Sequence, residues 1–184
     1  MASTVHQLKV TLRNVKPPIW RRIVVPSYLT LGELSIVLLA AMGWTDSHLH
    51  VFEIGDTRYG MPDPEWDDLG FLDEDRISVG KALTVVGSRL RYEYDFGDGW
   101  EHDLLIEGIT LPDRTVKYPL CLAGRRACPP EDCGGPWGYG EILELLANPT
   151  RPDPEEIRAW VGPDFDPKHF DVDEATAAMR AWLA

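Results

Sequence analysis

The chain has 184 residues and a mass of 20.7 kDa, a length typical of one domain with a sizeable core. Hydrophobic residues make up 44% and charged residues 26%, which excludes an intrinsically disordered chain and a small disulfide-framework protein. The formal net charge of −12 repels polyanions, so we do not expect sequence-independent binding to nucleic acid.

We also expect a soluble, cytoplasmic protein that does not contact a membrane. The longest apolar run, residues 36–42, is far shorter than the roughly 18 residues of a spanning helix. The opening residues do not follow the charged-then-apolar pattern of a signal peptide.

The first part of the chain predicts a sheet with one covering helix. Alternating or β-branched side chains indicate strands over residues 6–13, 19–25 and 48–54. Thr30 and Glu33 have the spacing of a capping box, which predicts a helix that ends before Gly43. This β-β-α-β order is the opening of a β-grasp-like arrangement.

A long β-hairpin is expected to extend this sheet. Residues 55–76 are rich in turn formers and acids and predict a surface loop, and residues 78–83 predict a short helix. Strands over 89–96 and 100–109 are joined by Gly97, Asp98 and Gly99. With that connection Phe96 faces Trp100 and Tyr94 faces His102, so the apolar sides of both strands coincide.

The C-terminal part is expected to add helices after an irregular segment. Residues 118–140 contain all three cysteines and many glycines and prolines, which predicts a long loop. Helices are predicted over about 139–147, 154–161 and 172–183. The sequence therefore predicts one α+β domain, with a sheet core over about 5–111 and a C-terminal helical layer within 139–184.

Three histidines are candidate metal ligands. His48 and His50 are two residues apart on a predicted strand, so their side chains share one face. The predicted hairpin places His102 on the apolar side as well. Imidazole nitrogens bind zinc, iron or manganese, so a cluster of the three could hold a divalent metal. The alternative is that they are hydrogen-bonded core residues.

The cysteines leave several interpretations open. Cys121, Cys128 and Cys133 lack the C-x2-C spacing of a structural zinc knuckle. They could form a disulfide, supply a nucleophile or a metal ligand, or pack under the loop as small apolar groups. The acids of the hairpin could bind a cation or form a solvated acidic turn.

Basic residues gather at the start of the chain. Residues 1–30 contain five Lys or Arg and no acid. One interpretation is a basic edge for contact with DNA, formed by Lys9, Lys16, Arg21 and Arg22. The other is that these are outward-facing strand positions paired with acids from elsewhere.

Four stretches together resemble the plasmid ORF-three-like domain family, first labelled from an Agrobacterium rhizogenes plasmid: residues 18–22, 43–54, 94–102 and 127–135. The resemblance implies a single α+β domain over the whole chain, 1–184, of the kind found in bacterial and archaeal proteins linked to plasmids or mobile elements. It implies no defined activity. Ser35 departs from relatives that often have a histidine there. The matching positions that become site candidates are His48, His50, Asp95, Asp98, Trp100, His102, Glu131 and Asp132.

Three functional hypotheses follow. The leading one is a non-enzymatic binding or accessory module with a pocket for a protein or small-molecule ligand, shaped by His48, His50, Trp100 and His102. The second is a metal-dependent hydrolase in which the three histidines hold the metal and Asp95 or Glu131 acts as general base. The third is weak DNA association through the basic edge.

Overall fold

The strands of the protein form a single sheet in a computed structural model that describes residues 4–62, 70–148 and 154–183. They are β1 (Val5–Leu12), β2 (Trp20–Pro26), β3 (His50–Ile54), β4 (Thr57–Gly60), β5 (Leu72–Asp73), β6 (Arg89–Tyr94), β7 (Trp100–Thr110) and β8 (Leu120–Arg125). Their spatial order is β5-β4-β3-β6-β7-β1-β2-β8. Neighbours run antiparallel except β4 and β5, which run parallel.

The helices are α1 (Leu31–Met42), α2 (Val79–Ala82), α3 (Gly135–Ala147), α4 (Pro154–Val161) and α5 (Val172–Trp182). The protein is thus a mixed α+β single domain, as the sequence predicts. The opening order β1, β2, α1, β3 is also the predicted one. In the sheet, however, β6 and β7 lie between β3 and the β1–β2 hairpin.

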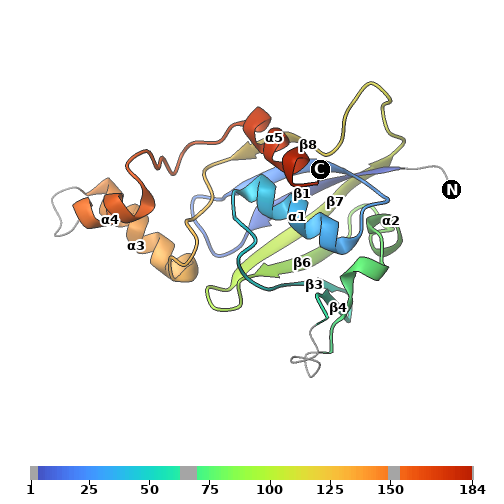
Figure 1. Cartoon of the computed structure of the whole chain (residues 1–184), viewed down its shortest axis with the longest axis horizontal. Helices are drawn as coiled ribbons and strands as arrows, with labels where there is room; N and C mark the ends of the chain where they lie inside the picture. The colour runs from blue at the N-terminus through green and yellow to red at the C-terminus, as the bar shows by residue number, and fades with distance from the viewer. Residues whose placement is uncertain (1–3, 63–69, 149–153, 184) are drawn as a thin grey trace.

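Helix α1 supplies much of the core because it lies across one face of the sheet (Figure 1). Its start is the predicted capping box, with Thr30 Oγ1 accepting from the Glu33 N–H at 3.1 Å and the Glu33 carboxylate accepting from the Thr30 N–H at 2.8 Å. Gly43 ends the helix in the left-handed conformation at φ 111°. Leu34, Val37 and Leu38 are buried against the strands.

Two predicted loops contain strands instead. Part of the 55–76 segment forms β4, β5 and a 3-10 turn at Glu74–Arg76, whereas its residues 63–69 lie outside the described residues. The 118–140 segment contains β8, which pairs with β2. These strands are short and lie toward the ends of the sheet, where tertiary pairing rather than a local hydrophobic pattern defines them.

The register of the β6–β7 hairpin also differs from the prediction. Tyr94 pairs with Trp100 and Tyr92 with His102, so the connection is two residues longer than expected. Asp95 leaves the strand at φ 55°, and its Oδ1 accepts the Gly97 N–H at 2.9 Å. This side-chain turn ends β6 early and leaves Phe96 41% exposed.

The three predicted C-terminal helices are present, and they lie in two places. Helix α5 packs against α1 and β8, whereas α3 and α4 contact each other at one end of the molecule (Figure 1). Gly135 explains where α3 docks, because its backbone lies against the Asp98 carbonyl at the hairpin tip. Among the helices that the structure describes, none combines the length and apolar character needed to cross a bilayer.

Candidate metal centre

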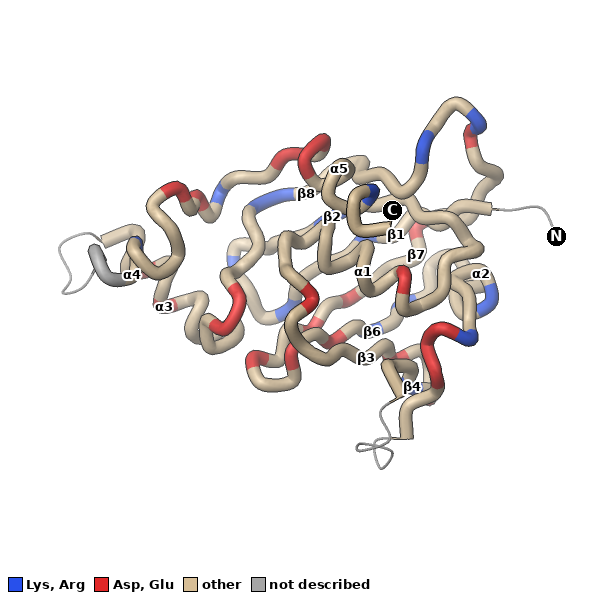
Figure 2. The backbone as a smooth tube through the Cα atoms, viewed as in Figure 1, with Lys and Arg blue, Asp and Glu red and all other residues tan. Residues whose placement is uncertain are grey.

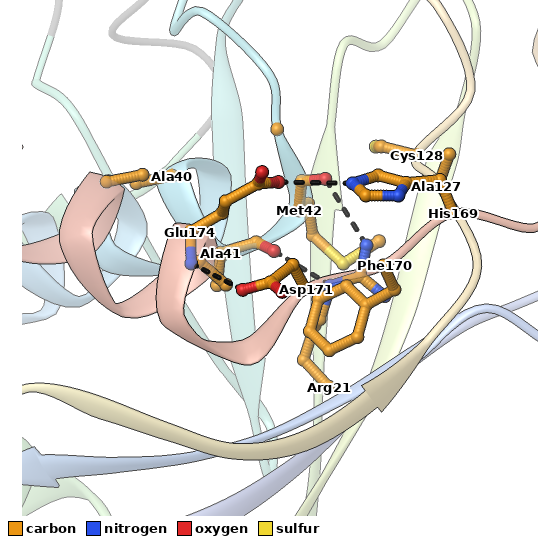
Figure 3. A pocket seen from close by; sticks show the side chains of 13 residues that line it. Arg21, Ala40, Ala41, Met42, Ala127, Cys128, His169, Phe170, Asp171 and Glu174 are labelled. Atoms are coloured by element: carbon orange, nitrogen blue, oxygen red, sulfur yellow. Dashed lines mark hydrogen bonds and ion pairs between the residues drawn. The ribbon is translucent and has the colours of Figure 1, made fainter. Parts of the chain in front are cut away.

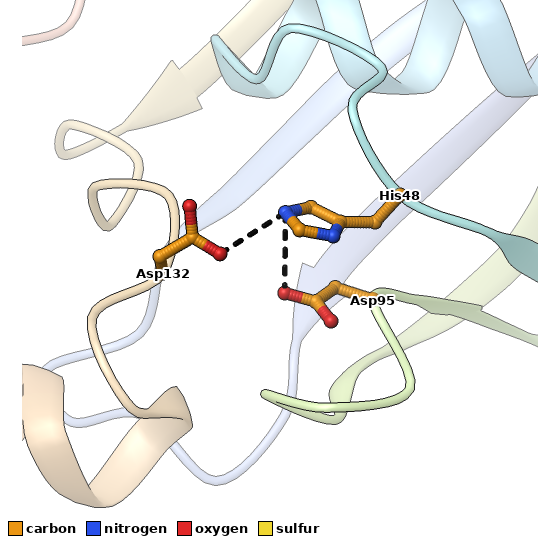
Figure 4. A group of neighbouring side chains, drawn as sticks. All are labelled: His48, Asp95 and Asp132. Carbon is orange, nitrogen blue, oxygen red and sulfur yellow. Dashed lines mark ion pairs between the residues drawn. The ribbon is translucent and has the colours of Figure 1, made fainter.

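One imidazole and two carboxylates converge at one end of the sheet (Figure 4). His48 Nε2 lies 3.2 Å from Asp132 Oδ1 and 3.7 Å from Asp95 Oδ2. The three ligand atoms all lie within 4.8 Å of one another. Among the residues that the structure describes, this is the one group of three such side chains that meets this distance.

The three residues come from segments far apart in the sequence. His48 lies in the loop before β3, and Asp95 directly follows β6. His50 pairs with Tyr94 in the sheet, so these two positions are at the same end of adjacent strands. Asp132 comes from the segment between β8 and α3. Asp95 and Asp132 both have positive φ, 55° and 54°, a conformation that aspartate tolerates better than most residues.

The three side chains differ in how far they are buried. The side chain of Asp95 is 9% exposed, that of His48 29% and that of Asp132 73%, so the group opens to solvent on the Asp132 side. The Nε2 atom of His48 is itself buried and has no hydrogen-bond partner within the described part of the chain. Its contacts with the two carboxylates are at ion-pair distance but lack hydrogen-bond geometry, and a cation placed between the three groups would contact all of them.

Glu131 and Tyr94 border this group and are hydrogen-bonded to its loops. Glu131 Oε1 accepts from the Thr45 N–H at 2.8 Å and from the Tyr94 hydroxyl at 3.1 Å. The Tyr94 hydroxyl in turn accepts from the Ser47 N–H at 3.0 Å. Burial, with a smaller effect of the nearby Glu131 charge, raises the pKa of Tyr94, so its hydroxyl stays protonated and donates.

The predicted cluster of three histidines is not formed. The His50 imidazole is paired with buried Glu74, with Nε2 and Oε2 2.9 Å apart. His102 is fully buried, with Nδ1 3.3 Å from the Tyr92 carbonyl oxygen, and burial lowers its pKa to about 4. The Tyr92 ring lies next to both imidazoles, at centroid distances of 5.7 and 5.5 Å. The prediction that the histidines meet on one face used residue spacing alone. Spacing does not show that the ring of Tyr92, on the neighbouring strand, lies beside both His50 and His102.

The other predicted site residues have structural partners. Asp98 Oδ2 accepts the Gly134 N–H at 3.2 Å and so joins the hairpin to the start of α3. Trp100 is buried beside Trp44, with ring centroids 5.6 Å apart. Sequence reasoning did not identify Tyr94 or Glu74 as site residues. For Tyr94 a signal existed, because a buried tyrosine hydroxyl requires a hydrogen-bond partner. For Glu74, no local sequence pattern predicts that the side chain is buried.

The three cysteines are free thiols. Burial raises the pKa of Cys121 and of Cys128 above the usual range and that of Cys133 to about 12. Because the thiolate is the reactive form, these environments disfavour a nucleophile and favour packing.

Three of the five basic residues within 1–30 are paired with acids or buried. Arg13 lies 2.7 Å from Glu101, and Arg22 lies 2.6 Å from Glu107. In the described part of the chain, blue Lys and Arg positions and red Asp and Glu positions lie among one another (Figure 2). Arg21 points inward. This charge pairing favours the interpretation of outward-facing strand positions over that of a DNA-contact surface.

Arg21 lines a hollow of about 310 Å³ between α1, α5 and residues 127–128 (Figure 3). Its guanidinium lies under the Phe170 ring at 4.0 Å and donates to the carbonyl oxygens of Ala41 and Met42 at the end of α1. Further bonds reach Trp20 and Arg125. These bonds assign Arg21 a structural role, because it joins α1 to β2 and β8.

Known proteins match almost the whole chain. Residues 4–174 match the family described as plasmid pRiA4b ORF-3-like protein. A curated relative from Sinorhizobium fredii (strain NBRC 101917 / NGR234), uncharacterized protein y4hQ, is 46% identical over 168 residues, which are 90% of this chain and 86% of the relative. The crystal structure of a protein of unknown function, MM3350 from Methanosarcina mazei Go1, is similar to this structure, with a TM-score of 0.87 and 35% sequence identity. The match covers 95% of this chain and 98% of the MM3350 chain.

Proposed function

Because this chain belongs to the plasmid pRiA4b ORF-3-like family, whose relatives above are named without an activity, we propose a function from its own geometry: a binding module that holds a divalent metal ion at His48, Asp95 and Asp132. The observation that carries this proposal is the buried Nε2 of His48, which has two carboxylates within 4 Å and no hydrogen-bond partner among the described residues. When its proton is on Nδ1, the imidazole has a lone pair on Nε2 that can bind a cation.

The donor set defines the class of metal. One imidazole and two carboxylates suit zinc, manganese or iron(II), whereas calcium prefers an all-oxygen shell. Two carboxylates also balance the charge of a divalent ion. Three protein ligands leave coordination positions open, and the exposed Asp132 side of the group is where an oxygen donor from a small molecule or a partner protein can reach the metal.

Binding is better supported than hydrolysis because both predicted general bases have other roles. Asp95 is a proposed ligand of the metal. Glu131 Oε1 accepts hydrogen bonds from Thr45 and from the Tyr94 hydroxyl, which assigns this carboxylate a role in joining the loops.

The test is calorimetric titration of metal-free protein with Mn²⁺ and with Zn²⁺. We expect about one ion per chain, and we expect His48→Ala and Asp132→Asn to weaken binding by at least about a hundredfold, because each removes a direct ligand. The matched control is His169→Ala. His169 lies 3.1 Å from Glu174 in an exposed pair of the same kind, and its loss leaves metal binding unchanged.

Two results would contradict this function: wild-type protein that takes up no stoichiometric metal, or His48→Ala protein that binds as tightly as wild type. In the second case the metal lies elsewhere in the molecule.

A further inference from the structure

Each of the three proposed ligands directly follows a residue of one hydrogen-bonded network. Ser47 precedes His48, Tyr94 precedes Asp95 and Glu131 precedes Asp132. The Ser47 N–H donates to the Tyr94 hydroxyl at 3.0 Å, and that hydroxyl donates to Glu131 at 3.1 Å. One tyrosine oxygen therefore connects the three segments that carry the ligands.

The direction of these bonds is determined by their chemistry. A backbone N–H can only donate and an ionised carboxylate can only accept. The single hydroxyl proton of Tyr94 is therefore donated to Glu131, and the hydroxyl oxygen accepts the Ser47 N–H. Thr45 adds a backbone N–H and a hydroxyl to Glu131 Oε1, at 2.8 and 3.1 Å, so the His48 loop is attached at two points.

Neighbouring contacts hold the same three segments. The Asp95 N–H donates to the Leu49 carbonyl oxygen at 2.9 Å, which joins the end of β6 to the residue after His48. Asp95 and Asp132 both have left-handed backbone conformations, which their surroundings must maintain. The Tyr94 side chain is fully buried, so its hydroxyl has a fixed position.

We infer that Tyr94 and Glu131 are positioning residues for the metal centre, and that their hydrogen bond sets the distances between His48, Asp95 and Asp132 before the metal arrives. This inference rests on the proposed function. Neither residue contacts the ion. Their effect on affinity comes from preorganisation, since ligands held in place lose less conformational freedom on binding.

The test compares two tyrosines on the same strand. Tyr94→Phe removes the connecting hydroxyl and is expected to weaken Mn²⁺ binding by about 10-fold to 100-fold, the usual effect of removing a group that orients a metal ligand. Tyr92→Phe is the control: Tyr92 is equally buried, but its hydroxyl bonds to Ser35 at 2.7 Å, and we expect affinity within about twofold of wild type.

Two readouts separate positioning from a general loss of stability. With Co²⁺ bound, Tyr94→Phe is expected to shift the visible absorption bands, which report ligand geometry, while Tyr92→Phe leaves them in place. Glu131→Gln keeps a carbonyl oxygen for Thr45 and Tyr94, so it is expected to retain more affinity than Glu131→Ala. Equal affinities for Tyr94→Phe and wild type, or equal losses in the two tyrosine variants, would overturn the inference.

Amide hydrogen exchange of the metal-free protein distinguishes this inference from the proposed function. The Ser47 amide is expected to exchange faster in Tyr94→Phe than in wild type, with no change in Tyr92→Phe. If wild type binds no metal, the proposed function fails, and the exchange rates still show whether the Tyr94 hydroxyl holds the loop that contains Ser47. If Ser47 exchanges at the same rate in both tyrosine variants, the network itself does not hold the loop.

Discussion

At the scale of single residues, burial gives His102 a measurable influence on stability. Its imidazole is buried beside the rings of Trp44 and Tyr92, and burial lowers its pKa to about 4. The unfolded chain binds a proton near the ordinary histidine pKa of 6.5, whereas the folded protein does not. The stabilising effect of neutral His102 is therefore complete above pH 6.5 and decreases as the pH falls toward 4.

We expect the free energy of unfolding to fall by about 3 kcal/mol between pH 7.5 and pH 4 through this residue, at 1.36 kcal/mol per unit of pKa shift. Urea unfolding across this range measures it. His102→Gln is expected to be less stable than wild type at pH 7.5 and to depend less on pH, because it lacks the titrating imidazole. An equal slope in wild type and variant would show that other groups cause the acid sensitivity.

Adjacent arginines on β2 are expected to differ strongly in their effect on stability. Arg21 is 2% exposed and donates to four main-chain carbonyl oxygens. Lysine cannot reproduce this fork, so Arg21→Lys is expected to destabilise the protein by about 3 kcal/mol. Arg22 pairs with Glu107 on the open face, and Arg22→Lys is expected to cost less than about 1 kcal/mol. Denaturant midpoints of the two variants compare them directly, and similar losses would contradict the structural role of Arg21.

At the scale of elements, the start of α3 depends on one glycine. Gly135 has φ +68°, and a Cβ there would lie 2.3 Å from the Asp98 carbonyl oxygen. Gly135→Ala is therefore expected to destabilise the protein by more than about 2 kcal/mol and to move α3 away from the hairpin. Gly140 is the control within the same helix, because its Cβ position is open. Gly140→Ala is expected to be neutral or to stabilise by up to about 1 kcal/mol, measured by thermal unfolding.

The elements predicted well from sequence are those with a complete local signal. Helix α1 has a capping box, a wide apolar stripe and a terminal glycine, and all three appear in the structure. Strands β5 and β8 have weak local patterns and depend on their partners in the sheet. The hairpin register was wrong because Asp95 forms a side-chain turn, and a spacing rule for short connections does not include that competition.

The candidate site was predicted only in part, because local sequence patterns do not show which distant segments meet. His48, Asp95 and Asp132 were all candidates, but the histidines were grouped with one another rather than with the carboxylates. Strand spacing indicates which face a side chain is on and does not indicate which distant loop meets it. The contact between His48 and Asp132 joins residues from two loops, and no periodic pattern encodes it.

At the scale of the whole molecule, a metal bound at this site is expected to stabilise the fold. Its three ligands come from loops on different elements, so the ion cross-links segments that separate on unfolding. At a free concentration about 100-fold above Kd, a ligand specific for the folded state contributes about 2.7 kcal/mol, which raises Tm by about 5–10 °C in a domain of this size. Differential scanning calorimetry with and without Mn²⁺ measures this shift. The shift is expected to vanish in His48→Ala, and its persistence there would place the metal elsewhere.

The position of β7 in the sheet determines when the fold can close during synthesis. It lies between β6 and β1, and so it joins the half formed by β3 to β6 with the half formed by β1 and β2. On the ribosome, β1 is finished about ninety residues before β7 begins, a delay of roughly 5–20 s at ordinary elongation rates. For that interval the nascent chain presents β1 as an open strand edge, the kind of surface that pairs with other chains. We therefore expect the nascent chain to aggregate more readily than the folded protein, in which β7 covers this edge of β1.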